Sequence, residues 1–340
     1  PRDWSSDVGS SNLMAYGDNG GALGEWVGEP NAGLACMFTM MNNARLGVGI
    51  QGVAMGERAY QLARDYARTR VQGRDIAGAS AEAVPTIRHP DVQRMLMTMR
   101  ALTEGGRALA YSAAASLDLS HRHPDTAERQ RHQARLDLLT PVVKAWCTDA
   151  GVEAASLGVQ IHGGMGYIEE TGAAQLLRDA RIAPIYEGTN GIQANDLVFR
   201  KLGRDRGAAA QAFFDEIRAV ETTAAAAGPA LGSVSARLSA GRGALEKATQ
   251  WLVATQAGDP RAAAAGATTY LRMFGLVAVG ALLARCAAGA ATRNVESGYV
   301  EAKAATARFF ADHLLTQAPA LLEPIVSGSA STLALREDRF

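Results

Sequence analysis

A carboxylate beside a glycine, in a predicted loop that leads into a helix, is the arrangement in this sequence best suited to chemistry. Glu187 and Gly188 follow Pro184, which disfavours helix at the residue before it. Thr189 or the residue after it can cap a helix over about 192–202. Glu187 then lies in a tight loop, where Gly188 leaves room for a ligand. This placement suits a general base, although a Glu-Gly pair alone is more typical of an exposed loop.

A glycine cluster upstream is the second candidate for chemistry. Residues 160–167 read Gln-Ile-His-Gly-Gly-Met-Gly-Tyr, with three glycines in four positions. Such a stretch exposes backbone amides that can hold phosphate or pyrophosphate oxygens. Taken alone, a glycine cluster more often ends a helix.

The composition limits the class of protein. The chain has 340 residues, of which 48% are hydrophobic, so it can form a sizeable core and is not disordered. Basic and acidic residues balance at 34 each, which argues against a nucleic-acid surface or a polybasic membrane face. Cys36, Cys147 and Cys286 are far apart and show no metal-ligand spacing. They predict buried thiols in a reducing cytoplasm, and no metal site.

Two further features concern the ends and the membrane. No uncharged apolar run reaches the roughly 18 residues of a membrane span, and the most apolar stretch, 273–284, is shorter. No signal peptide is visible. The chain begins with Pro1 instead of Met, so we expect a fragment or a processed chain.

Long helices must position the two candidate segments. Residues 12–16 and 22–27 are typical of two strands joined by a glycine-rich turn. From Gly33 onward the apolar spacing is helical, and helices with short links predict an antiparallel bundle. We expect helices over about 33–70, 90–119, 138–160, 173–181 and 192–202, with Pro141 in the first turn of the third.

The composition changes near residues 203–207, where we place a domain boundary. Beyond it the sequence is rich in alanine and glycine and carries no recognisable site, so we interpret it as a structural second bundle. Helices are predicted over 208–226, 233–256, 260–291 and 296–317. The polar segment 121–133 contains three histidines but no ligand spacing, and we interpret it as a solvated connection or a frayed helix.

Together, in this order and at this spacing, the two motifs resemble the acyl-CoA dehydrogenase family, whose flavoenzymes carry a Gly-Gly-x-Gly-Tyr loop followed by Tyr-Glu-Gly-Thr. The resemblance covers residues 12–202 and is strongest over 140–202. Segments 37–45, 145–149 and 168–172 are similar to the branch that contains 3-methylmercaptopropionyl-CoA dehydrogenases, which has an extra C-terminal helical domain.

The resemblance implies a mainly α fold. Residues 1–30 would be the end of the family's middle β domain, a hairpin remnant. Residues 31–204 would be its C-terminal four-helix domain, and residues 205–340 the additional helical domain. The N-terminal domain and most of the β domain would be missing, so we expect the chain alone to carry only part of the active site.

The resemblance also implies a reaction, the FAD-dependent α,β-dehydrogenation of an acyl-CoA thioester. Glu187 would remove the α-proton while a hydride leaves the β-carbon for flavin N5, and the amide of Glu187 would bind the thioester oxygen. The favoured substrate is 3-methylmercaptopropionyl-CoA or a related medium or long acyl-CoA, and branched chains stay open. The implied partners are an electron-transferring flavoprotein and a second copy of the chain.

Several residues match the family's binding positions. Arg70 could instead be a solvated helix-end charge that favours the helix dipole. Gly73 stands where the family more often has an aromatic residue, and Gly191 where others have glutamine. The predicted flavin contacts are Arg70, Gln72, Gln160, Gly163, Gly164 and Thr189, and the predicted substrate contacts are Arg45, Tyr186 and Gly188.

Two other classes of function remain as hypotheses. One is a relative that keeps the fold but acts as a binding or protective protein, including one that binds nucleic acid. The other is a plain helical interaction module that uses its alanine-rich half as the partner surface. The balanced charge counts against the first, and the coincidence of both motifs counts against the second.

Overall fold

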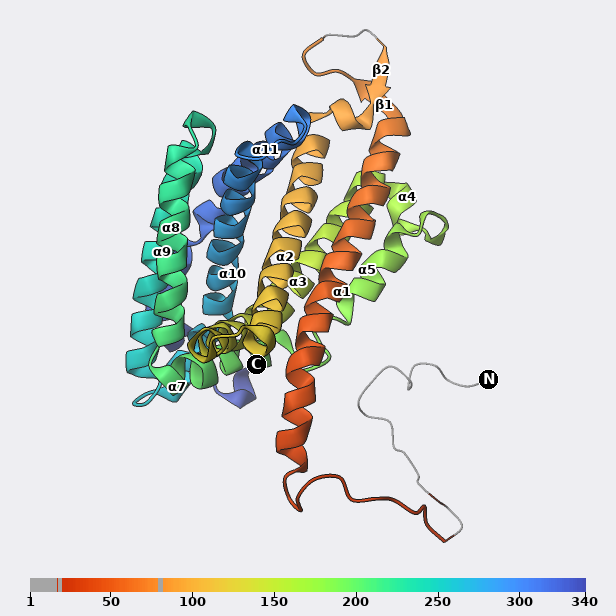
Figure 1. The fold of residues 1–340 in the computed structure, drawn as a ribbon. Coiled ribbons are helices and arrows are strands. Elements are labelled where there is room, and N and C mark those ends of the chain that lie inside the picture. The colour runs from red at the N-terminus through yellow and green to blue at the C-terminus, as the bar shows by residue number, and fades with distance from the viewer. Residues whose placement is uncertain (1–16, 18–19, 79–81) are drawn as a thin grey trace.

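Three long helices form the first half of the molecule (Figure 1). The computed structural model describes residues 17, 20–78 and 82–340. Consecutive helices run in opposite directions, as predicted, so the first and third are parallel neighbours. The helices are α1 (Gly33–Thr69), α2 (Pro90–Arg122) and α3 (Thr126–His162), and a hairpin of β1 (Val71–Arg74) and β2 (Ala83–Pro85) with the short helix η2 (Thr86–Arg88) joins α1 to α2.

Helices α1 and α3 approach closely because glycines lie where they meet. A Cβ atom on Gly52 would lie 2.4 Å from the carbonyl oxygen of Cys147. A Cβ atom on Gly151 would lie 2.5 Å from the carbonyl oxygen of Gly52. Both distances are shorter than any ordinary contact, so neither position accepts a side chain at this spacing. The backbones of α1 and α3 therefore pack directly against each other, beneath the loops that lie on them.

Helix α3 is longer than the sequence pattern predicted. It begins at Thr126, where the Asp125 carboxylate accepts hydrogen bonds from the amides of Ala127 and Glu128, at 2.7 and 3.4 Å. Pro141 therefore lies inside the helix, and its predicted place in the first turn was wrong. A proline there removes one backbone hydrogen bond, but Pro141 is buried, and packing outweighs that loss.

The loop that carries Glu187 lies between two short helices. Thr189 caps the second of them, as predicted, because its hydroxyl accepts a hydrogen bond from the amide of Ile192. That helix continues as a π-helix over the last predicted turns. These elements are α4 (Gly164–Tyr167), η3 (Glu169–Thr171), α5 (Ala173–Arg181), α6 (Asn190–Asn195), η4 (Asp196–Leu202) and α7 (Gly203–Asp205).

The second half is a further set of packed helices beside the first (Figure 1). The helical predictions there are confirmed, except that one helix starts earlier, with Pro229 in its first turn, and the helix predicted over 296–317 ends at His313. Short helices follow the last long one. The elements are α8 (Ala208–Ala226), α9 (Pro229–Thr255), α10 (Pro260–Ala291), α11 (Ser297–His313), α12 (Leu322–Ser327) and α13 (Ser329–Thr332), with 3₁₀ turns at Leu315–Gln317, Pro319–Leu321 and Glu337–Arg339.

The two halves share one hydrophobic core. Trp146 of α3 packs so closely on α10 that a Cβ atom on Gly275 would lie 1.9 Å from the indole ring. Helix α10 is long and apolar enough to cross a membrane by length and composition, yet 78% of its most apolar window is buried. Such burial is what the core helix of a packed bundle also shows. The predicted division near residue 204 remains a prediction.

The predicted N-terminal hairpin is not found where the chain is described. Its first strand, 12–16, lies outside the described residues. Its second, 22–27, forms no strand, and Leu23, Trp26 and Val27 are exposed. The predicted second strand was therefore wrong, because a short segment that buries none of its apolar side chains does not form a stable strand.

Candidate active site

The backbone at Glu187 adopts a conformation that side-chain-bearing residues rarely take. Its φ is 57°, and the φ of Gly188 is 83°, so two successive residues are left-handed. For a residue with a Cβ this conformation costs about 1–2 kcal/mol. The loop closes through a hydrogen bond of 3.0 Å from the amide of Asn190 to the carbonyl oxygen of Pro184. A half-buried carboxylate is thus held at a strained turn, as residues at functional sites often are.

The side chain of Gln193 supports this turn through hydrogen bonds to the turn's backbone. Its side chain is fully buried, and its Nε2 donates to the carbonyl oxygens of Glu187 and Gly188, at 3.3 and 3.1 Å. A Cβ atom on Gly188 would lie 2.9 Å from that same Nε2. Gly188 is therefore required by its left-handed backbone and by the support beneath it. From the sequence alone, Gly188 was predicted only to give a ligand access to the loop.

Arg45 lies behind the same turn. Its guanidinium forms a buried ion pair with Asp196, at 3.0 Å between Nη1 and Oδ2, and Nη2 lies 3.9 Å from the Cβ position of Gly188. Among the described residues, Arg45 Nε and Gln193 Oε1 have no hydrogen-bond partner. Arg45 thus lies against the loop from α1, and its predicted contact with substrate stays a prediction.

Tyr186 ties the loop to α1 as well. Its half-buried ring precedes Glu187, and its hydroxyl donates a hydrogen bond to Gln51 Oε1. The loop is therefore fastened to α1 through Tyr186 and to α3 through Asn190. Its predicted role as a substrate contact remains a prediction.

A basic pocket adjoins Arg45. Its volume is about 170 Å³. Four of its six lining residues are basic, and one is acidic. The lining residues are Asn42, Arg45, Asp196, Arg200, Lys201 and Arg204. An anionic group of a ligand that reaches Glu187 would find complementary charge here.

The predicted flavin contacts fall into two places. Thr189 stays with Glu187, where it is exposed and caps α6. The others lie at the far end of α1 and α3, where the rings of Tyr66 and His162 stack with centroids 4.4 Å apart. That stack brings together the C-terminal ends of the two helices. The predicted contacts at this far end are Arg70, Gln72, Gln160, Gly163 and Gly164, and all five are exposed.

The far end suits an anionic cofactor. Gly163 has φ 60° and ψ −140°, a combination that essentially only glycine adopts, and nothing lies within 4 Å of a Cβ on Gly163 or Gly164. The Gly163 amide donates to the carbonyl oxygen of Gln160 at 3.0 Å, so the exposed Arg70 guanidinium is the donor at this end that matches a pyrophosphate. From Gln51 to Arg70, α1 rises roughly 28 Å at about 1.5 Å per residue. Glu187 and this end therefore cannot contact one flavin ring together.

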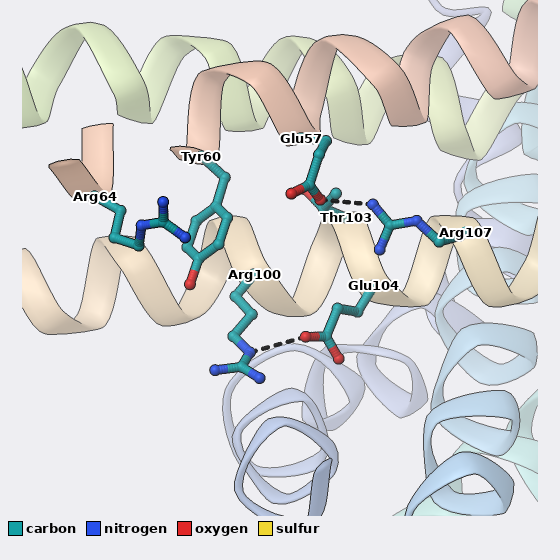
Figure 2. Close-up of a pocket in the computed structure, with 7 residues that line it drawn as sticks. All are labelled: Glu57, Tyr60, Arg64, Arg100, Thr103, Glu104 and Arg107. Carbon is teal, nitrogen blue, oxygen red and sulfur yellow. Dashed lines mark hydrogen bonds and ion pairs between the residues drawn. The ribbon is translucent and has the colours of Figure 1, made fainter. Parts of the chain in front are cut away.

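A separate cavity of about 230 Å³ lies between α1 and α2, and Figure 2 shows the residues that line it. Arg107 pairs with Glu57 at 2.6 Å, and Arg100 pairs with Glu104 at 2.9 Å. Lys303 of α11 also reaches Glu104, at 2.7 Å. None of the predicted site residues lines this cavity. It is an ion-pair network that joins the two halves.

The geometry defines a helical protein with a supported carboxylate turn and an exposed glycine end, and comparisons with known proteins identify the family of its helical domains. Residues 31–202 match the acyl-CoA dehydrogenase C-terminal domain, and residues 213–336 match a domain described as acetyl-CoA dehydrogenase C-terminal like. The chain belongs to the acyl-CoA dehydrogenase family.

Three curated relatives illustrate the likeness. A 3-methylmercaptopropionyl-CoA dehydrogenase of Ruegeria pomeroyi is 49% identical over 91% of this chain and 52% of its own length. A butyryl-CoA dehydrogenase of Syntrophomonas wolfei is 30% identical, over 98% of this chain and 56% of its own. The broad-specificity linear acyl-CoA dehydrogenase FadE5 of Mycobacterium tuberculosis is 31% identical, over 98% and 57%. The chain thus spans about half the length of these relatives.

Solved structures share the fold. Caenorhabditis elegans ACDH-11 in complex with C11-CoA has a TM-score of 0.69 at 24% identity, over 90% of this chain and 50% of its own. A Bacillus anthracis acyl-CoA dehydrogenase complexed with FAD has a TM-score of 0.68 at 16% identity, over 92% and 52%. The recognised family and the mainly helical fold are therefore confirmed as predicted.

The residues that support the Glu187 loop were not predicted from the sequence. Gln193, Asp196, Asn190 and Lys144 were not singled out as site residues. One signal was available, because Lys144 interrupts an apolar run over 141–147. A charged residue inside such a run is seldom buried without a partner, and that partner marks a structural or functional contact.

Proposed function

We propose that this chain is the helical part of a flavin-dependent acyl-CoA dehydrogenase in which Glu187 is the catalytic base. The observation that carries the proposal is the braced, left-handed turn at Glu187, held by Gln193 and closed by Asn190. A loop glutamate without a task would not need such support. The same observation favours catalysis over a binding protein that merely retains the fold.

In the proposed reaction the Glu187 carboxylate accepts the α-proton of the thioester. The electrons of the Cα–H bond form the Cα–Cβ double bond as the β-hydrogen leaves with its electron pair. Bound FAD supplies the acceptor for that hydride. The α-proton is weakly acidic, so the base must be positioned before the substrate arrives, and the turn accomplishes this. The backbone amide of Glu187 would donate to the thioester oxygen and stabilise its developing charge.

The remaining roles are proposals of the same kind. Thr189 would contact the flavin bound beside Glu187, and the exposed residues at the far end of α1 and α3 would hold the adenylate side of a second flavin. Their separation from Glu187 supports a homodimer in which each flavin is shared. The basic pocket at Arg45 would receive an anionic part of the CoA moiety. An electron-transferring flavoprotein would reoxidise the enzyme, and the cytoplasm stays the predicted location.

For the substrate we favour 3-methylmercaptopropionyl-CoA, because the relative of that name is 49% identical to this chain. The test is an anaerobic titration of the protein expressed from its full-length gene, followed by the visible flavin spectrum. We expect 3-methylmercaptopropionyl-CoA to bleach the flavin band at lower concentration than straight-chain acyl-CoAs of four to about sixteen carbons. Bleaching by a straight chain alone would overturn the substrate, and a protein without flavin would overturn the function.

A further inference from the structure

Lys144 is a buried cation that the proposed chemistry leaves unexplained. It lies in α3 with none of its surface exposed. Burying an ammonium costs free energy unless it gains hydrogen bonds in return. Its Nζ donates to a neutral group, Asn190 Oδ1, at 2.9 Å. The partner of Lys144 therefore lies at the start of α6, three residues after Glu187.

Asn190 uses its whole side chain to bind α3. While Oδ1 accepts from Lys144, Nδ2 donates to Asp149 Oδ1 at 2.7 Å and to the carbonyl oxygen of Ala145 at 3.2 Å. The backbone amide of Asn190 closes the turn on Pro184. One residue thus joins the rigid α3 to both sides of the Glu187 turn.

Charge around Lys144 favours the same arrangement. Asp149 on its own helix and Glu187 in the loop attract the ammonium, whereas Arg45 on α1 repels it. Burial, with the repulsion by Arg45, lowers the pKa of Lys144 to about 8 against the pull of the two carboxylates. At neutral pH the side chain is therefore largely cationic.

We propose that Lys144 is a positioning residue that acts through Asn190, fixing the turn so that the Glu187 carboxylate and amide keep the geometry for proton abstraction. The inference rests on the proposed function for its catalytic consequence. Its structural part, a clamp between α3 and the loop, is independent of substrate and cofactor.

The test is a double-mutant cycle in the protein expressed from its full-length gene. Lys144→Met keeps the length of the side chain and removes its charge, and Asn190→Ala removes the amide that Lys144 binds. Each variant should slow single-turnover flavin reduction on the order of 10- to 100-fold at saturating acyl-CoA. The double variant should be no slower than the slower single variant, because both changes break one linkage. Rates that multiply would overturn the proposal.

Hydrogen exchange of the peptide 184–196 gives a readout that does not need activity. We expect faster exchange in both single variants. Thr140→Ala is the matched control, because Thr140 is buried one turn earlier in α3 and its hydroxyl bonds only to Leu136 of its own helix. It should leave exchange in this peptide and the reduction rate unchanged. Unaltered exchange in Lys144→Met or Asn190→Ala overturns the clamp.

The two proposals fail in different ways. A wild-type flavin that no acyl-CoA reduces, with faster exchange in Lys144→Met, would overturn the function and keep the clamp. A reducible wild type with unchanged rates in both variants would keep the function and overturn the positioning role. If Lys144→Met does not fold, Asn190→Ala alone still decides, because Asn190 lies at a half-buried helix start.

Discussion

The Glu187 turn and the far end of α1 and α3 are built in opposite ways. At the turn, buried groups from several elements fix one strained conformation, and Gln193 and Asp196 show how fully it is packed. At the far end, Gly163 and Gly164 have no atom near their Cβ positions, and Arg70 is exposed. The difference teaches that this chain itself supplies the support of the Glu187 turn, whereas it leaves the glycines at the far end uncovered.

Gly188→Ala tests the packing of the Glu187 turn. The substitution puts a Cβ on a residue with φ 83° and within 2.9 Å of Gln193 Nε2, so the turn must move. Flavin reduction by acyl-CoA should slow on the order of 100-fold, since small displacements of a catalytic group cost about that much. Stopped-flow absorbance measures the rate of flavin reduction. Gly191→Ala is the control, because its Cβ would meet nothing closer than 3.8 Å. Equal rates for the two variants would refute the packing argument.

Arg70→Ala tests the far end of α1 and α3. If the guanidinium holds a flavin pyrophosphate, losing it removes a charged hydrogen bond that contributes about 1.5–3 kcal/mol. The dissociation constant for FAD should rise about tenfold or more, as measured by fluorescence on reconstituting the apoprotein. The control is Arg68→Ala, which removes a charge two residues earlier that lies 3.7 Å from Asp65. An equal loss in both variants would mean that general charge, and not this position, attracts the flavin.

Lys201→Ala tests the basic pocket next to the turn. A half-buried surface charge such as Lys201, when it steers or binds an anion, contributes roughly 0.2–1 kcal/mol. The KM for acyl-CoA should therefore rise a few-fold, with kcat unchanged, and the effect should shrink as salt increases. Steady-state kinetics at two ionic strengths provide the measurement, with the exposed Lys247→Ala of α9 as control. A fall in kcat with KM unchanged would contradict the assignment.

Stability at high pH tests the burial of Lys144. Its folded pKa, about 8, lies below the unfolded value, so between about pH 8 and 10.5 the unfolded chain binds more protons. The free energy of unfolding should therefore rise with pH in that window, by about 3–4 kcal/mol at most. Urea unfolding of wild type and Lys144→Met at several pH values isolates this contribution as their difference. A difference that does not change with pH would show that the ammonium is not desolvated.

The same contrast explains what the sequence predicted and what it did not. Glu187, Thr189 as the cap and most helix bounds follow from local patterns, because turn residues and apolar spacing act over a few positions. The start of α3 was missed because Pro141 was taken as a first-turn signal, although Asp125 followed by Glu128 marks a cap.

The supports of the turn depend on contacts across the chain, which local patterns do not reveal. Arg45 meets Asp196 across 151 positions, and Lys144 meets Asn190 across 46. The strand predicted over 22–27 failed for a related reason, since a short apolar segment does not form a stable strand unless its side chains pack on other elements, and these are exposed. Contacts between residues far apart in the sequence decide both the support of the turn and the failure of the predicted strand.

The central claim is that Glu187 is the base, and Glu187→Gln tests it most directly. The amide keeps the size of the side chain but cannot accept the α-proton. In anaerobic stopped-flow mixing of the full-length protein with its best acyl-CoA, the variant should bind the thioester, seen as a shift of the flavin band, and reduce the flavin about 10²- to 10⁴-fold more slowly than wild type. Reduction at the wild-type rate would contradict the account.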